Sequence, residues 1–502
     1  MSNCKNKWRI VMTIIAALSV GSCSKTSNHG GEVTPIPTAR APVLSGVQVE
    51  GLNEEIQPSF DPTIKHYAIQ CGDGDPFSIS VETENVDLIS FNNKTSGDGA
   101  SDFENLTLED DILLRISNEF AEDTYYFHCI SKDLPTFAID EKTNEVDEGF
   151  LIVSPRFGGN QQTYLAIIDN NGVPRFRRRL VGTATDFKRH PDGRYSYAYR
   201  YGYTEFDKPD YEIVILDEQF KEQKRLSTIG LSATDNHDFL ITETGNYLLI
   251  SYAPAYRDMR PWGLSANELT RDSVIQEQTP EGEVVFEWNS WDSVDIESCL
   301  IHRFPDDYAH INSIFVTSDN NIIASLRGCS MIVKIERETG ATIWKLGGFN
   351  SDLEIMGDPY HEFCGQHTAT MTDETLLLFD NGGPCNGDRE AVYGQFSRAV
   401  SYVIDESAAQ ANFIEEYSYN NEYLGYTRSG GSVFTTRNGN WLISWSTGVQ
   451  DITEITHDKQ IAMRIKILEG ENQIRAYRAY RAYDLLLPIS LDGEVTYTRF
   501  SN

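Results

Sequence analysis

Positively charged residues are scarce in this chain. Of its 502 residues, 42 are Lys or Arg and 75 are Asp or Glu, so the formal net charge is −33. Nucleic acids are bound mainly through Lys and Arg contacts to phosphates, and this balance argues against a nucleic acid as partner. The same negative field disfavours docking of the protein surface on an anionic membrane.

Helical periodicity is nearly absent. Short apolar or alternating runs recur instead between turns rich in Gly, Asn and Asp, as in 247–252, 321–326 and 441–445. Many short strands with turn signals between them indicate a β-sandwich or a β-propeller. Hydrophobic residues make up 40% of the chain and aromatic residues 11%, which is enough to bury a core. We therefore predict a folded, all-β protein.

The apolar run near the N-terminus, 10–20, is too short to span a bilayer. It follows three basic residues and ends in Leu-Ser-Val-Gly-Ser directly before Cys23. This pattern resembles a bacterial lipoprotein signal, in which residues 1–22 are removed and Cys23 carries the lipid. An ordinary secretory signal peptide cleaved nearby is the alternative. We expect residues 23–43 to form a flexible tether, and the protein to be exported and lipid-anchored in the cell envelope, either in the periplasm or at the cell surface.

No Cys-x-x-Cys pair occurs, and its lack argues against a zinc thiolate site. Six of the eight cysteines remain beyond the expected signal and lipid attachment: Cys71, Cys129, Cys299, Cys329, Cys364 and Cys385. An even number in an exported protein favours disulfides. We predict a Cys71–Cys129 pair because both residues lie in one small candidate domain. The pairing of the other four stays open.

A change in sequence character near 134–147 divides the chain. Residues 44–134 fit one small sandwich that resembles immunoglobulin-like or cadherin-like domains. After the break, a turn followed by an apolar strand repeats, most clearly at 243–251 and 437–444. Such repeats predict a β-propeller of about six blades over residues 145–502. The innermost strands of a propeller border its central channel, so equivalent positions in successive blades meet there.

Histidines precede several copies of this repeat. Three of them, His237, His310 and His367, stand in similar local contexts, and Arg327 follows a candidate inner strand. We predict that these four residues form a functional cluster. His190 differs because His-Pro-Asp-Gly is typical of a turn, so we expect it to be structural. A zinc site built from the three histidines is disfavoured because Arg327 would repel a cation; no metal or other cofactor is predicted.

Five ordered motifs carry a resemblance to a known family. They are 307–313 (Asp-Tyr-Ala-His-Ile-Asn-Ser), 325–327 (Ser-Leu-Arg), 340–348 (Gly-Ala-Thr-Ile-Trp-Lys-Leu-Gly-Gly), 366–367 (Gln-His) and 378–382 (Leu-Phe-Asp-Asn-Gly). The chain resembles the bacterial aryl-sulfate sulfotransferases over roughly residues 145–450. The resemblance implies an N-terminal β-sandwich followed by a six-bladed propeller. It also implies transfer of a sulfuryl group from a phenolic sulfate ester to a phenol, without a nucleotide donor, through a transiently sulfurylated histidine.

The resemblance also assigns roles to individual residues. The Gln-His motif makes His367 the nucleophile, and the family's further active-site residues match His237, His310 and Arg327. Asn312 matches its substrate-binding asparagine. Which of His237 and His310 acts as acid or base stays open, as does whether the protein forms a homodimer.

Two features depart from the family or leave alternatives. A Cys364–Cys385 disulfide would lie beside the nucleophile, whereas the family places its disulfide in a loop shortly before the nucleophile. The expected lipid anchor is a second difference, because known members of the family are often soluble. Arg398 matches a family pattern, and we expect it to form an ion pair that stabilises a blade.

The alternative function is a non-catalytic propeller that binds an anionic aromatic or glycan ligand; a metal-dependent enzyme is a weaker third hypothesis.

Overall fold

A computed structural model describes residues 40–52, 56–72, 74–107, 109–156, 162–203, 209–302, 305–383, 396–422 and 425–500. It confirms the expectation of an all-β chain, because the helices found within these ranges are all short turns. They are η1 (Arg260–Trp262), α1 (Ser290–Ser293), η2 (Ile296–His302), η3 (Pro305–Asp307) and η4 (Arg327–Cys329). No sheet of the described strands closes on itself. The expected signal, residues 1–22, and Cys23 lie outside the described residues.

Two sheets near the N-terminus share one hydrophobic core. The first has the order β1 (Val43–Glu50), β3 (Phe77–Glu84), β6 (Ala100–Phe103). The second has the order β2 (His66–Gln70), β8 (Glu122–Ile130), β7 (Asp111–Ser117), β4 (Leu88–Phe91), β5 (Lys94–Ser96). Leu44 and Ile79 of the first sheet pack with Ile112 and Phe127 of the second. The two sheets thus pack face to face over a shared core, as sheets do in a sandwich.

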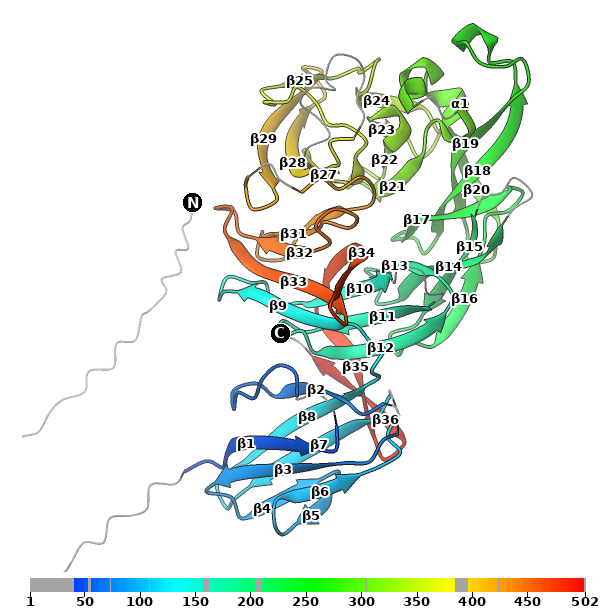
Figure 1. Ribbon diagram of the computed structural model, residues 1–502. Coiled ribbons are helices and arrows are strands. Elements are labelled where there is room, and N and C mark those ends of the chain that lie inside the picture. The colour runs from blue at the N-terminus through cyan, green and yellow to red at the C-terminus, as the bar shows by residue number, and fades with distance from the viewer. Residues whose placement is uncertain are drawn as a thin grey trace, which may run out of the picture. The chain divides into compact units, whose positions relative to one another are not determined.

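Four antiparallel sheets then follow one another along the chain (Figure 1). The first comprises β13 (Ala184–Arg189), β14 (Tyr195–Tyr203), β15 (Pro209–Leu216) and β16 (Glu222–Leu226). The second comprises β17 (Ala233–Ile241), β18 (Tyr247–Arg257), β19 (Glu268–Gln278) and β20 (Val284–Asn289). The third comprises β21 (Ile311–Val316), β22 (Ile322–Leu326), β23 (Met331–Ile335) and β24 (Thr342–Gly347). The fourth comprises β26 (His367–Thr372), β27 (Thr375–Asp380), β28 (Arg398–Asp405) and β29 (Gln410–Ser418), with β25 (Glu354–Met356) added parallel to β29.

A nine-stranded sheet joins segments from both ends of this region. Its main path is β12 (Pro174–Val181), β11 (Gln162–Ile168), β10 (Phe150–Arg156), β34 (Asn472–Ala482), β33 (Ile461–Glu469), β32 (Ile452–Ile455), β31 (Trp441–Ser444), β30 (Ser432–Thr435). Strand β9 (Thr136–Lys142) pairs with β33. The late strands β33 and β34 therefore lie beside the early strands β9 and β10, as Figure 1 shows.

The first strands of successive sheets contact each other in turn. Strand β13 contacts β17, which contacts β21, then β26, β30 and β34, and β34 contacts β13 again. Several of these strands carry an irregular register, between Thr234 and Phe239 in β17 and between His367 and Ala369 in β26. Thr368, inside the second irregularity, has a φ of +47°. Such bulges turn side chains away from the ladder direction and are common beside active sites.

A buried ion network ties these first strands together. Lys188 on β13 bonds Asp186 at 2.7 Å and Asp238 at 2.5 Å, and Arg478 on β34 bonds Asp238 at 3.1 Å. Arg478 also donates to the carbonyl of Asn312 at 2.8 Å. Because every charge in the network has an opposite partner, the desolvation cost of burying it is offset.

The ion pair expected for Arg398 is present. Its guanidinium is buried and bonds Asp358 and Asp380, each at 2.9 Å, and Glu416 at 2.5 Å. Asp380 also accepts hydrogen bonds from the backbone of Cys364 and Gly382. The network therefore holds the end of β27 against the segment that leads into His367.

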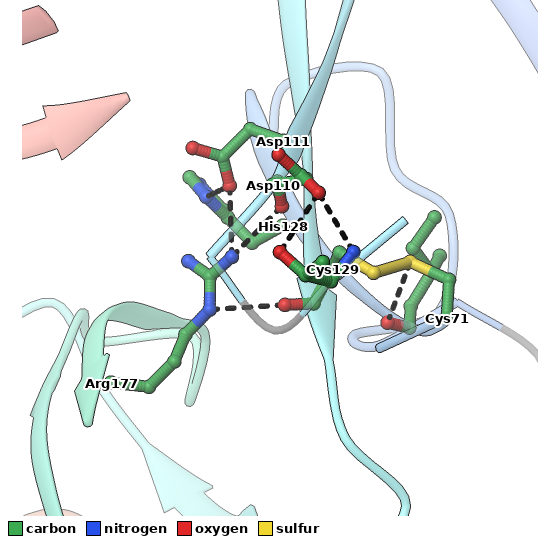
Figure 2. Close-up of a disulfide and its surroundings, with 8 residues drawn as sticks. Cys71, Asp110, Asp111, His128, Cys129 and Arg177 are labelled. Carbon is green, nitrogen blue, oxygen red and sulfur yellow. Dashed lines mark hydrogen bonds and ion pairs between the residues drawn. A yellow bond between two sulfur atoms is a disulfide. The ribbon is translucent and has the colours of Figure 1, made fainter. Parts of the chain in front are cut away.

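The predicted Cys71–Cys129 disulfide is confirmed, and a charged junction surrounds it (Figure 2). Arg177 on β12 donates to the Cys129 carbonyl at 3.0 Å and to Asp111 at 3.1 Å. Asp111 also accepts from the backbone N–H of Ser490, in the C-terminal hairpin β35 (Leu485–Leu491) and β36 (Glu494–Phe500). Strands far apart in sequence thus meet at one buried carboxylate.

Two further cysteines left open by the sequence, Cys299 and Cys329, form a disulfide. Cys364 is also disulfide-bonded, and Cys385 lies outside the described residues. Disulfides of this kind persist in oxidising compartments, which fits an exported protein. Within the part of the chain that the structure describes, no helix is long and apolar enough to cross a membrane.

Candidate active site

The four residues predicted to form a cluster line one cavity of about 310 Å³. His237 lies in the irregular part of β17, His310 directly precedes β21, Arg327 begins η4 after β22, and His367 begins β26. The remaining lining residues are Thr185, Tyr211, Asn236, Ser429, Gly430, Ser446, Thr447, Arg475 and Tyr477. None of these lining residues carries a carboxylate, although the chain as a whole is strongly acidic. The cavity is therefore suited to an anion.

His367 is held at both ring nitrogens. Its Nδ1 lies 2.6 Å from Oδ1 of Asn381, and the backbone N–H of Gly430 donates to its Nε2 at 3.1 Å. The Asn381 amide donates through Nδ2 to the carbonyls of Thr427 and Gly430, at 2.8 and 2.9 Å. Its oxygen must then face His367, so Nδ1 carries the ring proton and Nε2 carries the lone pair.

The pKa of His367 is lowered well below its usual value. Burial is the largest cause, because it removes water from the charged form of the ring, and the nearby charge of Arg327 lowers the pKa further. The side chain is only 2% exposed. The imidazole is therefore neutral at physiological pH, and its Nε2 can act as a nucleophile.

His237 and His310 lie side by side in the cavity lining, in an edge-to-face contact with ring centroids 5.0 Å apart. Each is backed by a carboxylate: His237 Nδ1 lies 2.6 Å from Asp235, and His310 Nδ1 lies 2.8 Å from Asp307. Burial by itself would raise the pKa of Asp235, but the charge and hydrogen bonds of His237, together with the nearby His310, lower it overall. This pairing leaves the Nε2 atom of each ring to exchange a proton with a bound molecule.

Arg327 brings a positive charge to the cavity, which Arg475 also lines. One of its Nη atoms donates to the carbonyl of Arg428 at 3.3 Å, and its buried Nε has no hydrogen-bond partner among the described residues. Burial lowers the pKa of its guanidinium, which nevertheless stays protonated because its ordinary value is so high. A planar group with unused N–H donors is suited to hold the oxygens of a sulfuryl group.

The structure does not bring every predicted residue to the cavity. Asn312 is fully buried and does not line it; its Nδ2 donates to the carbonyl of Gln366 at 2.7 Å, directly before His367. His190 bonds Ser196 at 2.7 Å and is also absent from the lining, in agreement with its expected structural role.

Several site residues were not singled out by the sequence analysis. Asn381 stands in the motif 378–382, but only its contact with His367 shows its part in the site. Tyr477 lines the cavity beside His237, with ring centroids 6.0 Å apart, and its buried hydroxyl has no partner among the described residues. It belongs to the repeated Arg-Ala-Tyr pattern of 475–483, in which strand alternation places Arg475 and Tyr477 on the same face. This repeated pattern is the sequence feature from which Arg475 and Tyr477 could have been predicted as site residues.

Among the residues described by the structure, no group of three or more His, Cys, Asp or Glu side chains is arranged to hold a metal ion.

A buried neutral histidine, a charged arginine and two carboxylate-backed histidines thus meet at a cavity whose lining carries no carboxylate, an arrangement suited to hold an anionic group. The family comparison agrees with a site of this kind. The model of the family described as Arylsulfotransferase (ASST) matches residues 137–478, which is more than half of the chain. The chain belongs to the arylsulfotransferase family, and this membership supports sulfotransferase activity in general.

Other comparisons are more distant. No curated protein matches the chain. A protein of unknown function from Bacteroides caccae is 13% identical, with 63% of this chain and 93% of that chain covered and a TM-score of 0.40. A virginiamycin B lyase from Staphylococcus aureus, solved with quinupristin, is 11% identical, with 72% and 96% covered and a TM-score of 0.34. Neither likeness supports a conclusion about fold or activity.

Proposed function

We propose that the protein is a nucleotide-independent aryl-sulfate sulfotransferase that moves a sulfuryl group from a phenolic sulfate ester to a phenol through sulfo-His367. The observation that carries the proposal is the buried, neutral His367 in one cavity with Arg327 and two carboxylate-backed histidines. Family membership supports the same class of donor and acceptor.

In the first step, the lone pair on Nε2 of His367 attacks the sulfur atom of the donor. The bond between sulfur and the phenolic oxygen breaks, and its electron pair leaves on that oxygen. One of His237 and His310 donates a proton to the departing phenolate. The sulfur must replace the Gly430 amide as the partner of Nε2, which lies 3.1 Å from the Gly430 nitrogen.

In the second step, the hydroxyl of an acceptor phenol attacks the sulfur while a histidine takes its proton. The bond between nitrogen and sulfur breaks, and its electron pair returns to Nε2. Arg327 stabilises the negative charge on the sulfuryl oxygens in both steps, and positioning accounts for much of the remaining rate, as it does in phosphoryl transfer. We propose that Asn312 supports the segment before His367 through its hydrogen bond to the Gln366 carbonyl. A contact between Asn312 and the substrate stays a prediction.

The same proposal includes the architecture. The ring of contacts from β13 through β17, β21, β26 and β30 to β34 supports a six-bladed propeller, with β34 and β10–β12 as the sixth blade. We propose that residues 145–502 form this domain, with β9 added to it through its pairing with β33, and that residues 44–134 form the sandwich.

The experiment combines turnover with mass spectrometry. The protein is incubated with p-nitrophenyl sulfate and excess phenol without nucleotide, and nitrophenol release is followed. Intact mass is then measured after exposure to donor alone. We expect release and a sulfuryl adduct in wild type, and loss of both in His367→Ala. The control is His457→Ala, because the His457 side chain is 88% exposed.

The outcomes distinguish the proposed enzyme from a protein that only binds the donor. Absence of nitrophenol from wild type, or undiminished release from His367→Ala, would overturn the proposal. Donor binding without an adduct would favour a non-catalytic binding module.

We also propose that Cys23 carries a lipid. Wild-type protein expressed in a bacterial host is then expected in the membrane fraction, and Cys23→Ala in the supernatant. An equal distribution of the two would argue for an ordinary secretory signal instead.

A further inference from the structure

The three histidines of the cavity have different partners at Nδ1. His237 faces the carboxylate of Asp235 and His310 that of Asp307, whereas His367 faces the neutral amide of Asn381. The difference separates the two rings that exchange protons in the proposed reaction from the ring that attacks sulfur.

The surroundings of Asn381 require an amide at this position. Its Nδ2 donates to two carbonyl oxygens, those of Thr427 and Gly430, and the side chain is fully buried. A carboxylate here would turn an oxygen toward both carbonyls, and the repulsion between acceptors would disfavour it. The amide therefore has one available orientation, with its oxygen 2.6 Å from Nδ1 of His367.

We propose that Asn381 is a positioning residue that holds His367 in its Nδ1–H tautomer and, because it is uncharged, keeps the sulfo-histidine reactive. This inference rests on the proposed function and deepens it. A carboxylate partner would stabilise a proton on the ring and so reduce the neutral form that attacks. A neutral partner fixes the tautomer without this effect.

The charge of the partner also matters after the first step. When sulfur is bound to Nε2 and Nδ1 keeps its proton, the ring is cationic, and neutral imidazole leaves in the second step. A partner that removed the Nδ1 proton would make the leaving group an imidazolide anion, which is far more basic and leaves more slowly. The uncharged amide of Asn381 accepts the hydrogen bond and leaves the proton on the ring.

The first test needs no turnover. In protein labelled with ¹⁵N-histidine, the wild-type signal of His367, assigned by its loss in His367→Gln, is expected to show a protonated Nδ1 and an unprotonated Nε2 at neutral pH. In Asn381→Leu, which removes the acceptor, we expect a mixture of tautomers. An Nε2–H tautomer in wild type, or an unchanged signal in Asn381→Leu, would overturn the inference.

The second test separates the two half-reactions. We expect Asn381→Leu to lower kcat by about 10–100-fold with little change in KM, a range taken from the loss of groups that orient reactive side chains. In Asn381→Asp, the decay of the preformed adduct on addition of phenol should slow by at least about 10-fold, and the fall of the rate at acidic pH should begin at higher pH. Urea unfolding of each variant shows that it is folded under assay conditions.

The controls distinguish this inference from the proposed function. If wild type forms no adduct, the proposed function fails, whereas the tautomer measurement still judges the role of Asn381. If the adduct forms but decays at the same rate in wild type and Asn381→Asp, the inference fails alone. Asp235→Asn serves as the reciprocal variant and is expected to leave the His367 tautomer unchanged.

Discussion

Replacing Arg327 by Gln tests the electrostatic part of the proposed reaction. The guanidinium lines the cavity, and among the described residues its one hydrogen bond runs from an Nη atom to the Arg428 carbonyl at 3.3 Å. Its Nε has no partner within the described ranges. A guanidinium has five N–H donors, so several are available to the sulfuryl oxygens. Gln keeps a polar side chain but removes the charge and most of these donors.

The size of the effect follows from this count. Removal of one preorganised donor at a site of developing negative charge costs about 2.7–4 kcal/mol, or about 10²–10³ in kcat. Because Arg327 offers more than one donor and a full charge, we expect kcat/KM of Arg327→Gln to fall by at least about 10²-fold.

The same variant should change the pH profile. His367 reacts when it is neutral, so the rate falls as pH drops through its pKa. The charge of Arg327 lowers this pKa in addition to burial, so its removal raises the pKa of His367, although burial keeps it below the ordinary value. The acidic fall of the rate should therefore begin at higher pH in Arg327→Gln than in wild type.

The assay measures nitrophenol release over the acidic and neutral range, with samples developed in alkali. Arg428→Gln is the matched control, since that side chain is exposed and absent from the cavity lining. A loss of less than about 10-fold would contradict the assigned role of Arg327. A large loss of kcat/KM without a shift of the acidic part of the pH profile would also contradict it, because it would show that the charge of Arg327 does not affect the pKa of His367.

Two further predictions concern stability and salt. Arg398→Met leaves three buried carboxylates without their cation, and we expect a loss of about 3–5 kcal/mol in urea unfolding. Arg260→Met, at a fully exposed ion pair, should leave the unfolding midpoint unchanged; equal effects in the two variants would contradict this reasoning. Added salt should raise kcat/KM about twofold to fivefold, because it screens the repulsion between the acidic surface and an anionic donor. A steep fall with salt would instead show that long-range attraction steers the substrate.

The clustering of His237, His310 and His367 was predictable because each stands at or near the first strand of a repeated sheet, and Arg327 was placed with them because it follows a candidate inner strand. In a repeated fold, equivalent positions of successive sheets lie close together. The repeat itself can be recognised from short segments of the sequence. The fate of Asn312 was not predictable in the same way. Its spacing from His310 matches the family motif, yet in the structure its amide bonds the backbone at Gln366.

The hydrogen-bond partners of the two ring nitrogens of His367 could not be predicted from the sequence, for a different reason. Asn381 and Gly430 are 14 and 63 residues from His367, and they reach it only because β27 and the segment before β30 pack around β26. Hydrophobic patterning predicts strands but not the orientation of a buried amide. That orientation depends on the carbonyls of Thr427 and Gly430, which become neighbours only after folding.

The pairing of β34 with β10 has a consequence for when activity can arise. Strand β34 carries Arg475 and Tyr477 of the cavity lining and Arg478 of the buried ion network, all within the last 28 residues of the 502-residue chain. Contacts between segments so distant in sequence form late in folding. During synthesis, the three histidines emerge well before the strand that completes their cavity. The cavity can therefore be complete only after β34 has been synthesised and has paired with β10.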